Sequence, residues 1–196
     1  MKRWEGKTMD FQAKMFNRKA SDPKNKPDQI LETLALQLGQ NVADIGAGGG
    51  YFSLRFAEAV GNEGHVFAVD TNSSFLEFIK KSAEEKGLDN VETVLATEDG
   101  LNLPETADLV FVRNVCHHIP NRVEYFRKLK SSLKPNGKVA IIEYKRGGGL
   151  FSFRRMFGHH VPKEIIVEEM NKARYQLEKA FDFLPEQSFT IFSVHK

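Results

Sequence analysis

The sequence has almost no cysteine: among its 196 residues, only Cys116 carries a thiol. A single cysteine excludes an intramolecular disulfide and any metal site built from several thiolates, and we expect no metal site. Small oxidised proteins usually rely on several disulfides, so the scarcity predicts a reducing compartment.

Long apolar runs are missing as well. The first residues, MKRWEGKTMDFQAKMF, scatter their charges and contain no apolar core of signal-peptide length. No stretch approaches the ~20 consecutive apolar residues that a membrane-spanning helix needs. We therefore expect a cytoplasmic protein without stable membrane insertion.

The sequence also lacks a strong excess of charge of one sign. Its formal net charge is +2 at pH 7, which gives no reason to expect nucleic acid as a partner. Hydrophobic residues make up 41% and charged residues 28%, the balance of an ordinary globular protein. With 16 Phe and one Trp, Phe should supply a large part of the core.

Apolar runs of strand length alternate with helical patterns along most of the chain. Strands are predicted at 41–46, 64–70, 90–96, 107–114 and 138–144, and helices at 28–38, from Phe52 onward, at 73–87 and at 122–133. A Ser74–Glu77 capping box and Gly87 should begin and end the third helix. This alternation predicts a parallel sheet that helices cover on both faces.

The two ends of the chain differ from this pattern. Residues 1–27 are polar and basic, and we expect an N-terminal arm with one short helix near Phe11–Arg18, followed by a single domain over 28–196. Residues 145–162 form a loop-like insert with three consecutive glycines and several aromatics, and a helix at 163–173 follows. Two last strands, joined by a tight turn at 185–187, predict a hairpin and hence one antiparallel strand in the sheet.

A glycine-rich turn follows the first predicted strand, in the segment VADIGAGGGYFSLRFA. Glycines at positions 46, 48 and 50 allow a sharp turn and a close approach of a ligand to the backbone. A tight strand-to-helix turn that binds nothing would use glycine too. Twenty residues after Gly50, the second strand ends in Asp70, whose carboxylate could accept from both ribose hydroxyls or could favour the next helix start.

The charge beside the glycines separates two cofactors that fit this pattern. A dinucleotide places its pyrophosphate at a G-x-G-x-x-G turn, whereas the spacing here is G-x-G-x-G with Asp44 adjacent. A carboxylate would repel a pyrophosphate but would attract an ammonium or a sulfonium. The pattern therefore favours S-adenosylmethionine (SAM), and a NAD(P)-dependent oxidoreductase remains the less favoured alternative.

Four segments together resemble the class I SAM-dependent methyltransferases, in the small-molecule branch that contains UbiE-like and arsenite-methylating enzymes. They are VADIGAGGGYFS, VFAVD, LPETADLVFVRNVCHHI and LKPNGKVAIIEY. The single cysteine argues against the arsenite-methylating relatives. The resemblance implies an α/β, Rossmann-like three-layer sandwich with a seven-stranded, mostly parallel sheet of order 3-2-1-4-5-7-6, in which strand 7 is antiparallel. It also implies SAM as cofactor and an unidentified small-molecule acceptor.

The resemblance further implies which residues bind SAM. The glycines would wrap the methionyl part, Asp44 would orient its amino group, Asp70 would hold the ribose, and Glu98 or Asp99 would bind adenine. The full set of implied cofactor-binding residues is Asp44, Gly46, Ala47, Gly48, Gly50, Asp70, Thr71, Glu98, Asp99 and Asn114, the last through its backbone. Many relatives have Thr where this chain has Gly49, so we expect a looser loop here.

The acceptor side is less defined by the sequence. His117 and His118 follow the fourth strand, where they could position an acceptor, act as a base, or simply hydrogen-bond the loop. The insert at 145–162, which contains His159 and His160, could cover the acceptor, hold an acidic acceptor, touch a membrane surface, or simply pack its Phe residues onto the core. A monomer or homodimer is expected. A non-catalytic SAM-binding regulator or partner subunit remains an alternative, because methyl transfer requires no particular residue.

Overall fold

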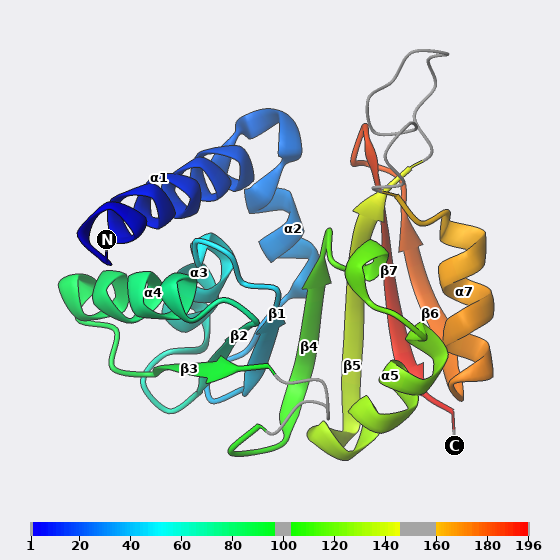
Figure 1. The fold of residues 1–196 in the computed structure, drawn as a ribbon. Helices are drawn as coiled ribbons and strands as arrows, with labels where there is room; N and C mark the ends of the chain where they lie inside the picture. Colours follow the sequence, from blue (N-terminus) through cyan, green and yellow to red (C-terminus); the bar gives the residue numbers. More distant parts are fainter. Residues whose placement is uncertain (1, 97–102, 146–159, 196) are drawn as a thin grey trace, which may run out of the picture.

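A seven-stranded sheet forms the centre of the computed structural model, which describes residues 2–96, 103–145 and 160–195. The strands are β1 (Val42–Ile45), β2 (Val66–Asp70), β3 (Val91–Leu95), β4 (Ala107–Arg113), β5 (Leu133–Tyr144), β6 (Tyr175–Phe181) and β7 (Gln187–Val194). Their order is β3-β2-β1-β4-β5-β7-β6, and β7 runs antiparallel to both β5 and β6 (Figure 1). The predicted fold class, strand order and antiparallel strand are confirmed.

Helices cover both faces of this sheet. The described helices are α1 (Lys2–Ser21), α2 (Pro27–Leu34), α3 (Tyr51–Val60), α4 (Ser73–Lys86), α5 (Arg122–Leu129) and α7 (Lys163–Lys172), with short 3-10 turns at Pro23–Asn25, Cys116–His118 and Lys130–Ser132. Figure 1 shows α1 to α4 on one side of the sheet and α5 and α7 on the other. Within the described segments, no helix combines the length and apolar character needed to cross a membrane.

Each face of the sheet carries its own apolar core. One core gathers Phe52 and Phe56 of α3 against Phe111 of β4, and the other packs Phe126 of α5 against the opposite face. Several phenylalanines are fully buried, as the composition predicts. All four residues of β1 are buried, because a central parallel strand has helices above and below it.

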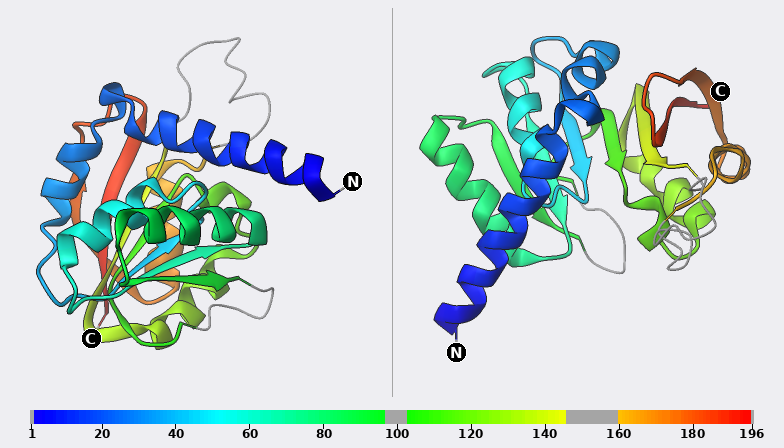
Figure 2. Two further views of the ribbon diagram at one scale, coloured as in Figure 1. Left: turned by 90° about the vertical axis from the view of Figure 1, so that its left-hand side faces the viewer. Right: turned by 90° about the horizontal axis from the view of Figure 1, so that it is seen from above.

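The first helix is longer than the sequence predicted. A short helix near Phe11–Arg18 was expected within a polar arm, but α1 spans Lys2–Ser21. It lies across α3 and α4, as Figure 2 shows from two further directions. Ala13 and Ala20 are buried, and the Phe16 ring meets the Phe75 ring edge-to-face at 5.6 Å. Small residues on one side of α1 permit this close packing. The polar composition of the segment did not predict it.

Three smaller predictions about element boundaries also differ from the structure. The cap of α4 is Asn72, which accepts from Ser74 N–H at 2.9 Å, because Asn72 still has extended backbone angles whereas Ser74 is already helical. Strand β5 begins at Leu133, before the predicted turn, since its first residue already pairs with β4. The connection between β6 and β7 is longer than the expected tight turn. Gly87 ends α4 as predicted.

Candidate functional site

The glycine loop turns the chain sharply at the carboxyl end of β1. Both Gly46 N–H and Ala47 N–H donate to the carbonyl of Val69 on β2, at 2.8 and 3.0 Å. Gly46 has a φ of +72°, and a side chain there would run into Val115. A residue other than glycine would therefore be strained and would also collide with the loop that follows β4.

Helix α1 packs against the glycine loop and forms hydrogen bonds to its backbone. The Asn17 side chain donates to the Gly49 carbonyl at 2.8 Å and accepts from Tyr51 N–H at 3.1 Å. Tyr51 is the first residue of α3, whose own cap, Gly50, has no side chain, so Asn17 caps α3 from another helix. A Cβ at position 49 would collide with the Ala13 carbonyl. The expectation of a looser loop at Gly49 is therefore wrong.

Asp70 links the glycine loop to the start of α4. Its Oδ2 accepts from Gly48 N–H at 2.9 Å, and its Oδ1 accepts from Asn72 N–H at 3.0 Å. The carboxylate is half-buried and borders a cavity. Each oxygen has a second lone pair, so both can accept from a ligand while keeping these bonds.

Asp44 is an almost fully buried acid, with 4% of its surface exposed. Ser53 Oγ donates to its Oδ2 at 2.6 Å. Burial raises the pKa of Asp44 to about 6, and the negative charge of Asp70 adds to this rise, whereas the Ser53 hydrogen bond and the positive charge of Arg113 oppose it. A cation that bound beside Asp44 would stabilise its charged form.

A single cavity of about 2040 Å³ joins these groups to the loop after β4. The predicted site residues in its wall are Asp44, Gly46, Ala47, Gly48, Asp70, Thr71, Asn114, His117 and His118. Gly50 is not in the wall, because it packs against Ile79 of α4. Glu98, Asp99, His159 and most of the insert (146–159) lie outside the described residues. His160 is half-buried and not part of the wall.

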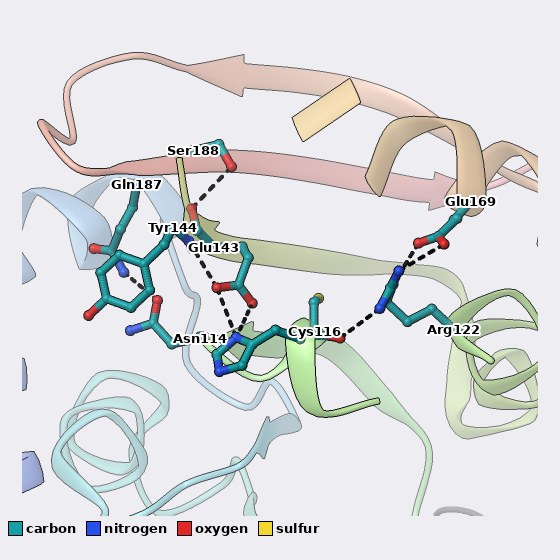
Figure 3. Close-up of polar contacts among 9 residues, drawn as sticks. Asn114, Cys116, Arg122, Glu143, Tyr144, Glu169, Gln187 and Ser188 are labelled. Atoms are coloured by element: carbon teal, nitrogen blue, oxygen red, sulfur yellow. Dashed lines mark hydrogen bonds and ion pairs between the residues drawn. The ribbon is translucent and has the colours of Figure 1, made fainter. Parts of the chain in front are cut away.

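Asn114 lies at the carboxyl end of β4. It has a φ of +57°, and its N–H donates to the Ile142 carbonyl at 2.8 Å. Its side-chain oxygen accepts from Gln187 Nε2 at 2.6 Å, so the amide is tied to β7 (Figure 3). Asn114 lies in the cavity wall, and its contact with a cofactor stays a prediction.

His117 is held against a buried carboxylate. Its Nδ1 lies 3.2 Å from both carboxylate oxygens of Glu143, whose side chain is fully buried on β5. Burial raises the pKa of Glu143, and the backbone N–H groups of Tyr144, His117 and Cys116 oppose that rise. Tyr144 N–H donates to Glu143 Oε1 at 2.9 Å (Figure 3). An ionised Glu143 fixes the proton of the imidazole on Nδ1 and leaves Nε2 as the basic atom.

The neighbouring His118 has a different environment. It is exposed, and its ring centroid lies 4.1 Å from that of His117. Both histidines border the cavity, and the Glu143 carboxylate lies within hydrogen-bond distance of the His117 ring. Both predicted catalytic candidates therefore lie in the cavity wall, and their roles stay predictions.

Sequence reasoning missed three residues of this site. Glu143 could have been found, because an acid inside the apolar run VAIIEY is rare unless it has a partner. Arg113 likewise ends the apolar strand β4 and lines the cavity. Asn17 gave no signal, because its partners Gly49 and Tyr51 are more than thirty positions away along the chain.

Comparisons with known proteins agree with this geometry. A family model described as a methyltransferase domain matches residues 36–182. The demethylmenaquinone methyltransferase of Listeria welshimeri is 28% identical over 116 residues, which cover 59% of this chain and 49% of that protein. The ubiquinone/menaquinone biosynthesis C-methyltransferase of Vibrio campbellii is 26% identical over 157 residues, which cover 76% of this chain and 60% of that protein. The chain thus spans about half the length of the first of these relatives.

A solved structure shows the same fold over nearly the whole chain. It is a SAM-dependent methyltransferase from Aquifex aeolicus, with a TM-score of 0.83 and 20% identity, and the match covers 93% of this chain and 96% of that one.

Fold and family together define a class I SAM-dependent methyltransferase domain, whose cofactor is S-adenosylmethionine. The chain belongs to the methyltransferase-domain family whose model it matches. The residues present fit this cofactor: the buried acid of Asp44 would suit its ammonium group, and the two carboxylate oxygens of Asp70 would suit its ribose hydroxyls.

The raised pKa of Asp44 predicts that SAM binds more weakly at acidic pH. The ammonium group of SAM attracts the ionised acid, so affinity should fall as the pH drops from about 7 to about 5, through the Asp44 pKa of about 6. An α-amino group stays protonated over this range, since its usual pKa is about 7.7–8.0. Calorimetric titrations of SAM at both pH values measure the effect.

The Asp44→Asn variant is the control for this titration. It should bind SAM more weakly at neutral pH and should lose most of the pH dependence, because the titrating group is gone. Equal affinity of the native chain at both pH values would show that Asp44 does not face the ammonium group.

Proposed function

We propose that this protein transfers a methyl group from SAM to a small aromatic acceptor that carries an ionisable hydroxyl, of the phenol or hydroquinone type. The observation that carries the proposal is the shared cavity, which has the glycine loop and Asp70 in one part of its wall and His117, backed by Glu143, in another. The two curated relatives named above act, by their names, in quinone biosynthesis.

The size of the cavity supports two ligands at once. Sites for one small molecule usually enclose about 300–1,000 Å³. The cavity here is about 2040 Å³, so SAM and an acceptor fit together. Its wall beyond the glycine loop includes Ile119, Tyr125 and Tyr144, whose apolar surfaces suit an aromatic ring.

The proposed chemistry needs one proton to be removed. Bound SAM would supply a methyl group on a sulfonium: an oxygen or carbon of the acceptor forms a bond to the methyl carbon while the bond from that carbon to sulfur breaks, and S-adenosylhomocysteine leaves. With a carbon nucleophile, the ring C–H proton is lost afterwards and the hydroxyl proton is restored, so one proton is released in either case. The Nε2 atom of His117 takes the hydroxyl proton of the acceptor and makes that nucleophile electron-rich. Glu143 stabilises the resulting imidazolium through Nδ1, and the glycine loop and Asp70 hold the cofactor in line.

Binding and transfer experiments test this proposal in sequence. Calorimetry with SAM, S-adenosylhomocysteine and NAD should show heat with the two sulfur compounds only. Labelled methyl from SAM should then pass to soluble 1,4-naphthohydroquinone, hydroquinone or catechol, and not to aliphatic amines or carboxylates. A chain that binds SAM but methylates only non-aromatic acceptors would contradict the acceptor class, and a chain that binds NAD instead would contradict the whole proposal.

A further inference from the structure

Arg113 is a mostly buried cation in the cavity wall, and no carboxylate of the described residues forms an ion pair with it. It ends β4, and its guanidinium carbon lies 5.1 Å from the centre of the Phe52 ring. Its Nε atom is buried and has no hydrogen-bond partner among the described residues. Burial lowers the pKa of Arg113. A buried charged donor without a partner is costly, and a ligand that completes the site is a physical explanation.

The sheet register places Arg113 beside the glycine loop. Ile45 of β1 pairs with Val112 of β4, so Arg113 stands next to Gly46 where the two strands end. Asp44 pairs with Phe111, two residues before Arg113, so Asp44 and Arg113 share one face of the sheet. Their charges influence each other, yet no ion pair joins them.

A ligand between these two side chains would meet one negative and one positive group. The methionine end of SAM carries an ammonium and a carboxylate on the same carbon atom, which matches that arrangement. We propose that Arg113 binds the carboxylate of the methionine part of SAM, while Asp44 faces its ammonium group. The inference rests on the proposed function, since it requires SAM in this cavity. A guanidinium suits a carboxylate because its N–H groups form a planar fork.

Lys19 is the competing cation in the same cavity wall. It belongs to α1, and its Nζ lies 5.4 Å from the centre of the Tyr144 ring. Its side chain is exposed, whereas that of Arg113 has already lost most of its water. A carboxylate gains more from the cation that water solvates less, so the assignment falls on Arg113.

Decarboxylated SAM provides the test, because it lacks only the group that Arg113 is proposed to bind. In calorimetry, Arg113→Gln should weaken the binding of SAM at least about tenfold, the effect of losing a hydrogen bond to a charged group. The same substitution should change the affinity for decarboxylated SAM by less than about twofold, the usual size of effect when no specific contact with the ligand is lost. Lys19→Gln, the matched control, should weaken neither ligand selectively.

Three results would overturn the inference. Equal losses for both ligands in Arg113→Gln would show that Arg113 supports the site as a whole. A carboxylate-specific loss in Lys19→Gln would assign the group to Lys19. No binding of SAM to the native chain would overturn the proposed function and the inference with it, and this result is distinct from the first two. If circular dichroism shows that Arg113→Gln is unfolded, Arg113→Lys keeps the charge over Phe52 but removes the planar fork, and it should still weaken SAM more than decarboxylated SAM.

Discussion

Replacing Asp70 with alanine should weaken SAM binding by about a hundredfold. The Asp70 carboxylate borders the cavity and can accept from both ribose hydroxyls. Each hydrogen bond to a charged group contributes about 1.5–3 kcal/mol net, so the loss of two costs at least about 3 kcal/mol, or about two powers of ten in affinity. The variant also loses the bond from Gly48 N–H, which loosens the loop that meets the cofactor. Calorimetry with SAM measures the change.

Glu63→Ala is the matched control for this substitution. Glu63 is an exposed acid in the loop before β2 and is not part of the cavity wall. Its removal should leave the SAM affinity unchanged, which separates the local effect of Asp70 from a general change in charge. If Asp70→Ala remains folded by circular dichroism and keeps its affinity for SAM, the role of Asp70 is limited to stabilising the start of α4.

Replacing His117 with alanine should lower kcat by about 10²–10⁴-fold, the usual contribution of a positioned general base. SAM affinity should change by less than about twofold, because the proposed contacts of His117 are with the acceptor. The measurement uses an aromatic acceptor identified in the transfer assay, with calorimetry of SAM alongside. Unchanged kcat would mean that His117 only supports the loop after β4.

The role of Glu143 should appear in the pH dependence of the reaction. Glu143→Gln keeps the shape of the side chain but removes the negative charge that faces His117 Nδ1. The imidazolium is then less stable, so the acidic limb of the kcat–pH profile should move to lower pH while maximal kcat falls. A purely structural Glu143 would lower kcat without moving the profile. His65→Ala, an exposed histidine outside the cavity wall, should leave the profile in place.

Much of the fold could be predicted from the sequence, because an apolar run such as Leu109–Val112 is typical of a strand in the buried interior of a parallel sheet. The strand order, in contrast, came from the family resemblance and not from hydrophobic patterning. The acids at positions 44 and 70 could be placed at the cavity because Asp44 lies one residue before the end of β1 and Asp70 is the last residue of β2, both beside the glycine loop. The cavity contains both of them.

Contacts between distant segments could not be predicted. The interaction of His117 with Glu143 joins residues 26 positions apart, and it depends on the pairing of β4 with β5. The length of α1 depends on its packing against α3 and α4, which a polar composition does not reveal. In both cases, tertiary structure decides the outcome, and local sequence carries only a weak signal.

The packing of α1 on the glycine loop couples substitutions in two distant segments. A threonine introduced at position 49 would collide with the Ala13 carbonyl and with Asn17, so it requires a first helix that lies further away. Such a displaced helix could no longer cap α3 through Asn17. We therefore expect the loop and the first helix to change together when the residue at position 49 changes. A chimaera that receives the loop of a threonine-bearing methyltransferase would need the first helix of the same donor.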